Sequence, residues 1–453
     1  MSTHGATCGL KVPVCPREYN GLVDEGWVER GGTRLHYLEW RPAESGDSPH
    51  EPSLFLLHGL SSNARVWARV ARLLPDRRIV ALDQRSHGPS DRPDSGYTLG
   101  ELVADAAHAI RELGLGRPLV AGHSWGAATA LALAATHPEL ASGLVVVDGP
   151  TSSFSRFMTW EQASERMQPP LPVYHDLGEA TAAQAAVLGE AWGDDLVEFV
   201  SAGLVEAPAG GLAPTLTAGV RLEILRELYE FQPELLFASV EGPILLAMAG
   251  RVWPGAPAEF IERRRRSVDE VQELRPDAQV RWYDSDHDVP LIRPAELALD
   301  IERTAVAAGF WSLAHEAASL AASPRSDWSR PAQGEGGEWD AKEVLAHMSS
   351  TQAAMATVIS APPPASSDSS GAVAFDSTRW NASQLRRREE RTPAELADEM
   401  RRGAEHAHAT LMAADLDAPT RVGPYSGLVL SDAMEAMLKH QRGHLAELRA
   451  ALA

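Results

Sequence analysis

The feature that most constrains the fold is residues 119–128, which read Leu-Val-Ala-Gly-His-Ser-Trp-Gly-Ala-Ala. An apolar run enters the Gly-His-Ser-Trp-Gly turn and an alanine-rich segment leaves it, so we expect a strand, a sharp turn and a helix with Ser124 at the apex. Such a turn strains its apical residue and leaves little room beside it, and Gly122 and Gly126 supply that room. Ser124 is therefore a candidate nucleophile, and the Trp125 amide at the helix N-terminus is a candidate oxyanion donor.

Patterns typical of buried strands recur on both sides of this turn. Short apolar runs at residues 53–57, 79–83 and 143–147 alternate with helical patterns. The alternation predicts a parallel sheet with helices on both faces, and it brings the residues that follow each strand to one edge. Those residues are His58, Asp83, Ser124 and Asp148. Gly59 lets the backbone approach a substrate closely, and the Leu60 amide is the expected second oxyanion donor.

Four motifs between about residues 20 and 305 stand in the order and spacing of the α/β-hydrolase fold family: His58-Gly59, Asp83-Gln-Arg-Ser-His-Gly-Pro-Ser90, Gly122-His-Ser-Trp-Gly126 and Asp286-His287-Asp288. This part of the chain resembles that family, which implies a serine nucleophile and a general base after the last strand. We expect His287 to take the Ser124 proton and return it to the leaving group. Asp83, Arg85 and His87 are expected to hold the neighbouring loop rather than touch the substrate.

The acid that orients the histidine is not at the family's common position. In many relatives a Gly-x-x-Asp motif follows the strand that corresponds to residues 244–248, but here Gly250-Arg-Val is followed by Trp253. Asp148, after the preceding strand, is the other location known in the fold, and we predict it as the acid; the alternative is an aspartate that caps the next segment. The four arginines at residues 263–266 stand among acidic residues and are expected to form an ion-paired, solvated helix face.

The sequence shows no further strand pattern after about residue 311. Helical segments at residues 310–322, 341–360, 393–414 and 430–452 suit an antiparallel bundle. His440 and His444 are four residues apart on one helix face, a spacing that lets both imidazoles bind one metal ion. His406 and His408 are two residues apart and so lie on different helix faces, and we do not count them as metal ligands.

The stretches 339–347, 379–382 and 440–444 resemble the DinB-like superfamily, which includes the mycothiol-dependent maleylpyruvate isomerases and thiol transferases. The resemblance implies a divalent metal (Zn, Ni or Fe) on His347, His440 and His444. The alternative is that these are ordinary surface or core histidines in a retained scaffold.

Composition excludes several other functions. The formal net charge of −21 argues against nucleic acid as a partner, because phosphate contacts need clustered Lys and Arg. No apolar run reaches the roughly 20 residues that a membrane helix needs. Both cysteines, Cys8 and Cys15, lie in a polar leader without a signal-peptide pattern, so no disulfide framework is expected and the cytoplasm is the predicted location.

These observations predict an α/β protein with a second, all-α domain: a mobile leader (1–20), an α/β-hydrolase domain (21–308) with a helical lid (about 151–237), and a DinB-like four-helix bundle (309–453). The leading hypothesis is a serine hydrolase that needs no cofactor in this domain and cleaves an ester, thioester or lactone bond of a small organic substrate. A second places metal-dependent thiol transfer or isomerisation, with a low-molecular-weight thiol, in the bundle. A third is a repurposed, non-hydrolytic protein of specialised metabolism.

Overall fold

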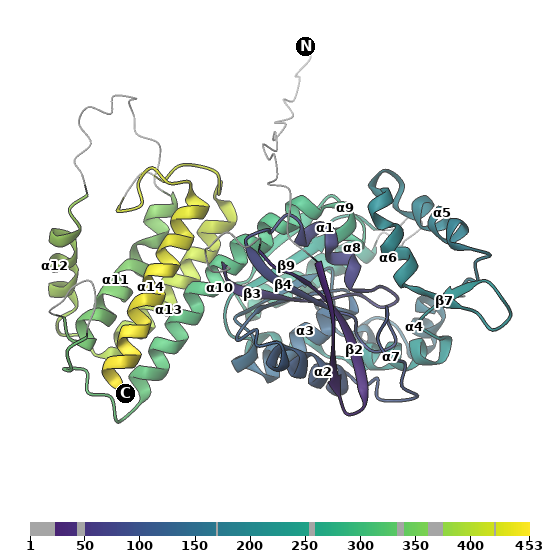
Figure 1. Ribbon diagram of the computed structural model, residues 1–453, viewed down its shortest axis with the longest axis horizontal. Helices are drawn as coiled ribbons and strands as arrows, with labels where there is room; N and C mark the ends of the chain where they lie inside the picture. Colours follow the sequence, from purple (N-terminus) through teal and green to yellow (C-terminus); the bar gives the residue numbers. More distant parts are fainter. Residues whose placement is uncertain are drawn as a thin grey trace, which may run out of the picture.

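The computed structural model describes residues 23–42, 50–168, 171–252, 259–332, 339–360, 375–420 and 423–453. The predicted leader with its two cysteines, and Trp253, lie outside these residues. Figure 1 shows a sheet layered with helices beside a bundle of long helices. The predicted fold class is confirmed.

An eight-stranded sheet forms the larger part, in the order β1-β2-β4-β3-β5-β6-β9-β10. β1 and β2 form an antiparallel hairpin and β2 also runs antiparallel to β4, whereas all later pairs are parallel. The strands are β1 (Val23–Arg30), β2 (Thr33–Trp40), β3 (His50–Leu57), β4 (Arg77–Leu82), β5 (Leu119–His123), β6 (Gly143–Val147), β9 (Ile244–Ala249) and β10 (Gln279–Tyr283).

Two apolar clusters cover the two faces of this sheet. Phe55 and Leu57 of β3 pack in a cluster with α2 (Leu99–Glu112) and α3 (Trp125–Thr136). Leu54 and Leu56 of the same strand pack in the other cluster, with α1 (Ala68–Ala71) and α10 (Pro294–Ala322). Successive side chains of a strand point to opposite faces, so a continuous apolar run is what a strand covered on both sides requires.

The segment between β6 and β9 leaves the sheet, as predicted for a lid. It contains α4 (Trp160–Met167), α5 (Leu177–Leu188), α6 (Val197–Ala202), the short hairpin of β7 (Leu204–Glu206) and β8 (Leu212–Pro214), and α7 (Ala218–Glu230). This segment contacts the loop after β3, where Asn63 Nδ2 donates to the carbonyl oxygen of Phe199 at 2.9 Å. The lid is thereby tied to the edge of the sheet at which the strands end.

The last helix of the sheet domain and the first bundle helix, which the sequence pattern places at residues 310–322, are one continuous element, the 29-residue α10. It contains no proline beyond its first residue, so nothing breaks it. Its first half supplies residues such as Ile301 to the sheet core, and its second half supplies Phe310 to the bundle core. A Cβ on Gly309 would lie 3.0 Å from Leu438 Cδ2, so glycine permits this close packing. The domain limit at residue 308/309 stays a prediction, because α10 serves both parts.

The bundle consists of the second half of α10 with α11 (Ala341–Ser360), α13 (Pro393–Ala413) and α14 (Leu430–Leu452). The bounds of α11, α13 and α14 agree closely with the predicted helices. A further helix that was not predicted, α12 (Ser377–Arg388), lies beside α11 (Figure 1). None of the described helices combines the length and the apolar stretch that crossing a bilayer requires.

A buried ion cluster joins the two parts. The fully buried Arg77 of β4 donates to Glu302 of α10 through Nε (2.6 Å) and Nη2 (2.7 Å). Nη2 also donates to Glu435 of α14 at 2.9 Å. One guanidinium therefore links the sheet, the shared helix and the bundle.

We predict that Arg77→Ala lowers the free energy of unfolding by about 3–5 kcal/mol, because it leaves two carboxylates without their buried partner. The measurement is equilibrium denaturation followed by circular dichroism. Arg402→Ala is the control, since Arg402 pairs with Asp398 on the surface of α13 and its loss costs about 0–1 kcal/mol. Equal losses for both variants would contradict a role for the cluster in docking.

Candidate functional site

The turn around Ser124 has the strained geometry that the sequence predicts. Ser124 lies between β5 and α3 with φ 55° and ψ −118°, a backbone conformation that is rare for a residue with a side chain. A Cβ on Gly122 would lie 2.3 Å from the Gly126 carbonyl oxygen, and one on Gly126 would lie 2.4 Å from that of His58. Both glycines are therefore required by close backbone contacts, and they leave Ser124 at the apex.

Ser124, His287 and Asp148 form a continuous chain of hydrogen bonds. Ser124 Oγ lies 2.8 Å from His287 Nε2, and His287 Nδ1 lies 2.6 Å from Asp148 Oδ2. Both distances fit hydrogen bonds. The structure thus brings together the three residues predicted as nucleophile, base and acid.

Asp148 is held for this contact by groups on its other oxygen. Oδ1 accepts the Ala249 amide at 3.0 Å and lies 3.1 Å from Arg264 Nη1. Arg264 also donates to the Ala249 carbonyl oxygen at 2.8 Å. The expectation that residues 263–266 form only a solvated face is therefore wrong for Arg264, whose side chain turns inward to a buried carboxylate. No sequence signal distinguishes Arg264 from its neighbours, because the pairing depends on how α8 (Glu259–Leu274) packs on β9.

The charges around this chain favour an ionised Asp148 and a basic His287. Burial raises the pKa of the Asp148 carboxyl group, but the hydrogen bond and charge of His287 and the charge of Arg264 outweigh burial and leave the pKa below its usual value. Burial lowers the pKa of the His287 imidazole, but the hydrogen bond and charge of Asp148 outweigh it and raise the pKa. His287 is thus a stronger base than a free histidine.

The two amides predicted to form the oxyanion hole lie beside Ser124. Trp125 is the first residue of α3, so its amide has no acceptor within the helix. Leu60 follows Gly59, at which a Cβ would lie 3.2 Å from Ser124 Cβ, so the loop after β3 passes directly against the serine. Their role as oxyanion donors stays a prediction.

Buried histidines hold the loops beside Ser124 in place through hydrogen bonds. His58 Nε2 accepts the Gln84 amide at 3.0 Å, and His87 Nε2 accepts the Ser61 amide at 3.2 Å. Burial lowers the pKa of His87 to about 4, so its ring is neutral and can accept. Asp83, Arg85 and His87 hold the loop as expected: Asp83 accepts from His36 and Ala64, and Arg85 pairs with Asp105.

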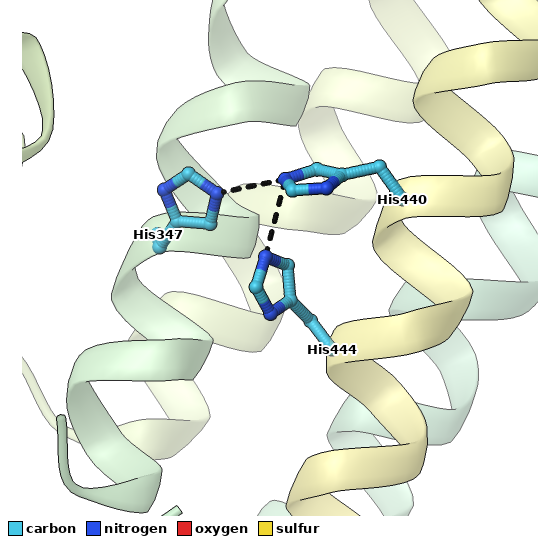
Figure 2. A group of neighbouring side chains, drawn as sticks. All are labelled: His347, His440 and His444. Atoms are coloured by element: carbon cyan, nitrogen blue, oxygen red, sulfur yellow. Dashed lines mark hydrogen bonds between the residues drawn. The ribbon is translucent and has the colours of Figure 1, made fainter. Parts of the chain in front are cut away.

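Three histidines of the bundle converge on one point, as Figure 2 shows. His440 Nε2 lies 3.2 Å from His347 Nε2 and 3.1 Å from His444 Nε2. Two nitrogens bound tetrahedrally to one zinc ion at about 2.0–2.1 Å lie roughly 3.3 Å apart. The three predicted ligands therefore have the spacing of a metal site.

Hydrogen bonding alone does not satisfy this cluster. His444 Nδ1 lies 3.0 Å from Glu447 Oε2, which places the proton of the neutral ring on Nδ1 and a lone pair on Nε2. A nitrogen that donates cannot also accept in the ring plane, so at most one of the two Nε2–Nε2 contacts is bridged by a proton. Burial, and then the neighbouring His444 and His440, lower the pKa of His347 to about 3. His347 is therefore neutral, and the three Nε2 atoms converge as the imidazole ligands of a divalent cation do.

A cavity of about 810 Å³ opens onto the three histidines. Its walls are mostly apolar, and the side chains that line it include Trp339, Val358, Phe375, Trp380, Leu385, Tyr425 and Met437. It lies between α11, α12 and α14, so the unpredicted helix α12 supplies one wall. The bundle therefore combines a candidate metal site with room for a small organic ligand.

Comparison with known proteins identifies both parts. Residues 52–191 match the alpha/beta hydrolase fold family, and residues 310–448 match the mycothiol maleylpyruvate isomerase N-terminal domain. The chain is a fusion of these two domains. The two resemblances read from the motifs are therefore confirmed.

Relatives of the hydrolase domain include enzymes with different substrates. The chain is 38% identical to 2-(acetamidomethylene)succinate hydrolase of Mesorhizobium japonicum over 98 residues, 21% of this chain and 35% of that protein. It is 29% identical to the lipase LipV of Mycobacterium tuberculosis over 55% of this chain and 92% of the lipase. The crystal structure of E-2-(acetamidomethylene)succinate hydrolase shares the fold, with a TM-score of 0.52 and 24% identity over 62% of this chain and 99% of that one. The chain spans about a third of the length of the first curated relatives it matches.

For the hydrolase domain we predict that Asp148→Asn slows the reaction of Ser124 with a fluorophosphonate by about 100- to 10,000-fold, because His287 loses the partner that orients it. In the wild type the rate rises with pH through a midpoint above 6.5, since only neutral His287 accepts the proton and its pKa is raised. Without the carboxylate that pKa falls, so the midpoint moves to lower pH.

The control for this pH profile is Asp284→Asn. Asp284 is an exposed aspartate in the loop that contains His287, and its carboxylate pairs with Arg251 and Arg293. This variant should keep the wild-type midpoint. An unchanged rate and midpoint in Asp148→Asn would show that Asp148 is not the acid.

Proposed function

We propose that the protein is a serine hydrolase that cleaves an ester, thioester or lactone bond of a small organic substrate through an acyl-enzyme. The observation that carries the proposal is the hydrogen-bonded chain from Ser124 Oγ through His287 to Asp148. The relatives of this domain include a hydrolase and a lipase, which supports bond hydrolysis.

In the proposed mechanism Ser124 Oγ attacks the carbonyl carbon while His287 Nε2 accepts its proton. The Leu60 and Trp125 amides stabilise the negative charge on the carbonyl oxygen. His287 then donates the proton to the leaving group, and Asp148 stabilises the imidazolium that exists between these steps. Water releases the acyl group from Ser124 by the same path. This chemistry needs no cofactor in the hydrolase domain.

The bundle supports a second function, metal-dependent transfer or isomerisation with a low-molecular-weight thiol. His347, His440 and His444 would hold the cation, and Glu447 orients His444. When bound, a divalent cation lowers the pKa of a coordinating thiol and so supplies a thiolate. The apolar walls of the 810 Å³ cavity would exclude water from the ligand.

A cytoplasmic location stays a prediction from cysteine usage.

If the protein is a serine hydrolase, a fluorophosphonate probe should label the purified protein. We expect one labelled site in the wild type and none in Ser124→Ala. In His287→Ala we expect labelling to slow by at least about 1,000-fold, because the serine loses its base. Mass spectrometry of the labelled peptide locates the adduct.

A folded wild-type protein that does not react with the probe would overturn the serine hydrolase and favour a repurposed, non-hydrolytic role. Ser164→Ala is a matched control, since Ser164 lies partly exposed on lid helix α4 and its hydroxyl donates to the Glu161 carbonyl oxygen one helical turn earlier. It should label like the wild type.

The second function predicts about one bound divalent ion per chain after incubation with Zn, Ni or Fe and dialysis, measured by elemental analysis. His440→Ala should lose the ion, because two imidazoles alone bind weakly. His406→Ala, an exposed histidine on α13, should retain it. Equal metal contents in both variants would show that the ion is bound elsewhere.

A further inference from the structure

Arg221, in the first turn of lid helix α7, stands beside the candidate active site without a counter-charge. Its Nη1 donates to Ser61 Oγ at 2.5 Å, and its Nε and Nη2 donate to the Met167 carbonyl oxygen at 3.3 and 3.1 Å. All these acceptors are neutral. No carboxylate oxygen in the described part of the chain pairs with Arg221.

Other partly buried arginines around the sheet have a carboxylate beside them. Five of them pair at 2.6–3.1 Å, namely Arg69, Arg77, Arg85, Arg264 and Arg275, and Arg117 lies 3.8 Å from Glu241. For Arg221, burial lowers the pKa of the guanidinium and no carboxylate offsets it. The group remains charged, because arginine does not lose its proton in proteins. A desolvated charge without a partner is costly, which favours an anion that comes from outside the chain.

Arg221 is placed to meet a substrate. Ser61, which it contacts, directly follows Leu60, the predicted oxyanion donor. The two Cα–Cα steps from Gly59 to Ser61 span at most about 7.6 Å, and Gly59 lies against Ser124. Arg221 therefore contacts the same short loop that passes against Ser124, and the chain lengths tested below measure how far its charge lies from the serine.

The guanidinium is also held in a fixed orientation. The bonds to Met167 come from the C-terminal end of α4, so Arg221 is braced between two lid helices. These contacts use three of its five N–H groups and leave two for a ligand. A planar fork of N–H donors matches a carboxylate, which can accept two parallel hydrogen bonds.

We propose that Arg221 binds a carboxylate of the substrate, so that the hydrolase acts on an acid-bearing ester, thioester or lactone. This inference rests on the proposed function, because it takes Ser124 as the nucleophile. The competing explanation is that the bond from Arg221 to Ser61 only latches the lid onto the loop after β3. The two explanations differ in what Ser61→Ala does, since that variant removes the latch and keeps the charge.

The test compares two fluorophosphonates with short alkyl chains that end either in a carboxylate or in its methyl ester, each made in several chain lengths. The readout is the ratio of the two labelling rate constants at Ser124, in which a general loss of folding or reactivity cancels. We expect the wild type to prefer the carboxylate at one or more lengths. Arg221→Met should lower the ratio by about 10- to 100-fold.

Three further variants complete the experiment. Arg221→Lys keeps the charge without the fork and should recover part of the ratio. Ser61→Ala should keep the ratio, and so should Arg226→Met, which removes an exposed arginine of the same helix that pairs with Glu230. A similar fall in Ser61→Ala would favour the latch and overturn the proposal.

The remaining outcomes separate this inference from the proposed function. If neither probe labels the wild type, the serine hydrolase itself fails. If both probes label Ser124 without preference at every length, or if Arg221→Met keeps the preference, the serine hydrolase stands and the carboxylate site is overturned.

Discussion

The arrangement of the hydrolase site depends on the contact between Gly126 and the carbonyl oxygen of His58. Any side chain at residue 126 would collide with the end of β3, since its Cβ would lie 2.4 Å from that oxygen. Because α3 can approach this closely, its N-terminus lies beside the loop that begins at Gly59. The positions of Ser124, of both predicted oxyanion amides and of the buried His58 and His87 all depend on this approach.

The hydrogen-bonded chain of Ser124, His287 and Asp148 depends on charged and polar groups outside the sheet's own ladder. Asp148 has two oxygens, and Arg264 with the Ala249 amide occupies one of them. The other is left to His287, so the histidine has one favourable orientation. A carboxylate that follows β6 thus orients a histidine that follows β10, two strands further along the sheet.

The residues that could be predicted from sequence are those fixed by local pattern. Ser124 and Asp148 directly follow apolar strands and His287 lies in the loop after one, while His440 and His444 share a helix face by spacing. Arg264, Arg221 and helix α12 were not predicted as parts of a site, because their roles depend on packing between segments far apart in the chain. The continuity of α10 was not predicted because the apolar pattern changes within this one segment. Its two halves bury different faces in different cores, and that change of surroundings reads as two helices.

Helix α10 also sets the mechanical relation between the two candidate sites. At about 1.5 Å per residue its 29 residues span roughly 43 Å, and each half is buried in the core of one domain. A helix anchored at both ends cannot act as a hinge. The bundle thus continues the sheet domain through one shared helix, and a molecule that served both candidate sites would have to leave one and diffuse to the other, without a swing of one domain toward its neighbour.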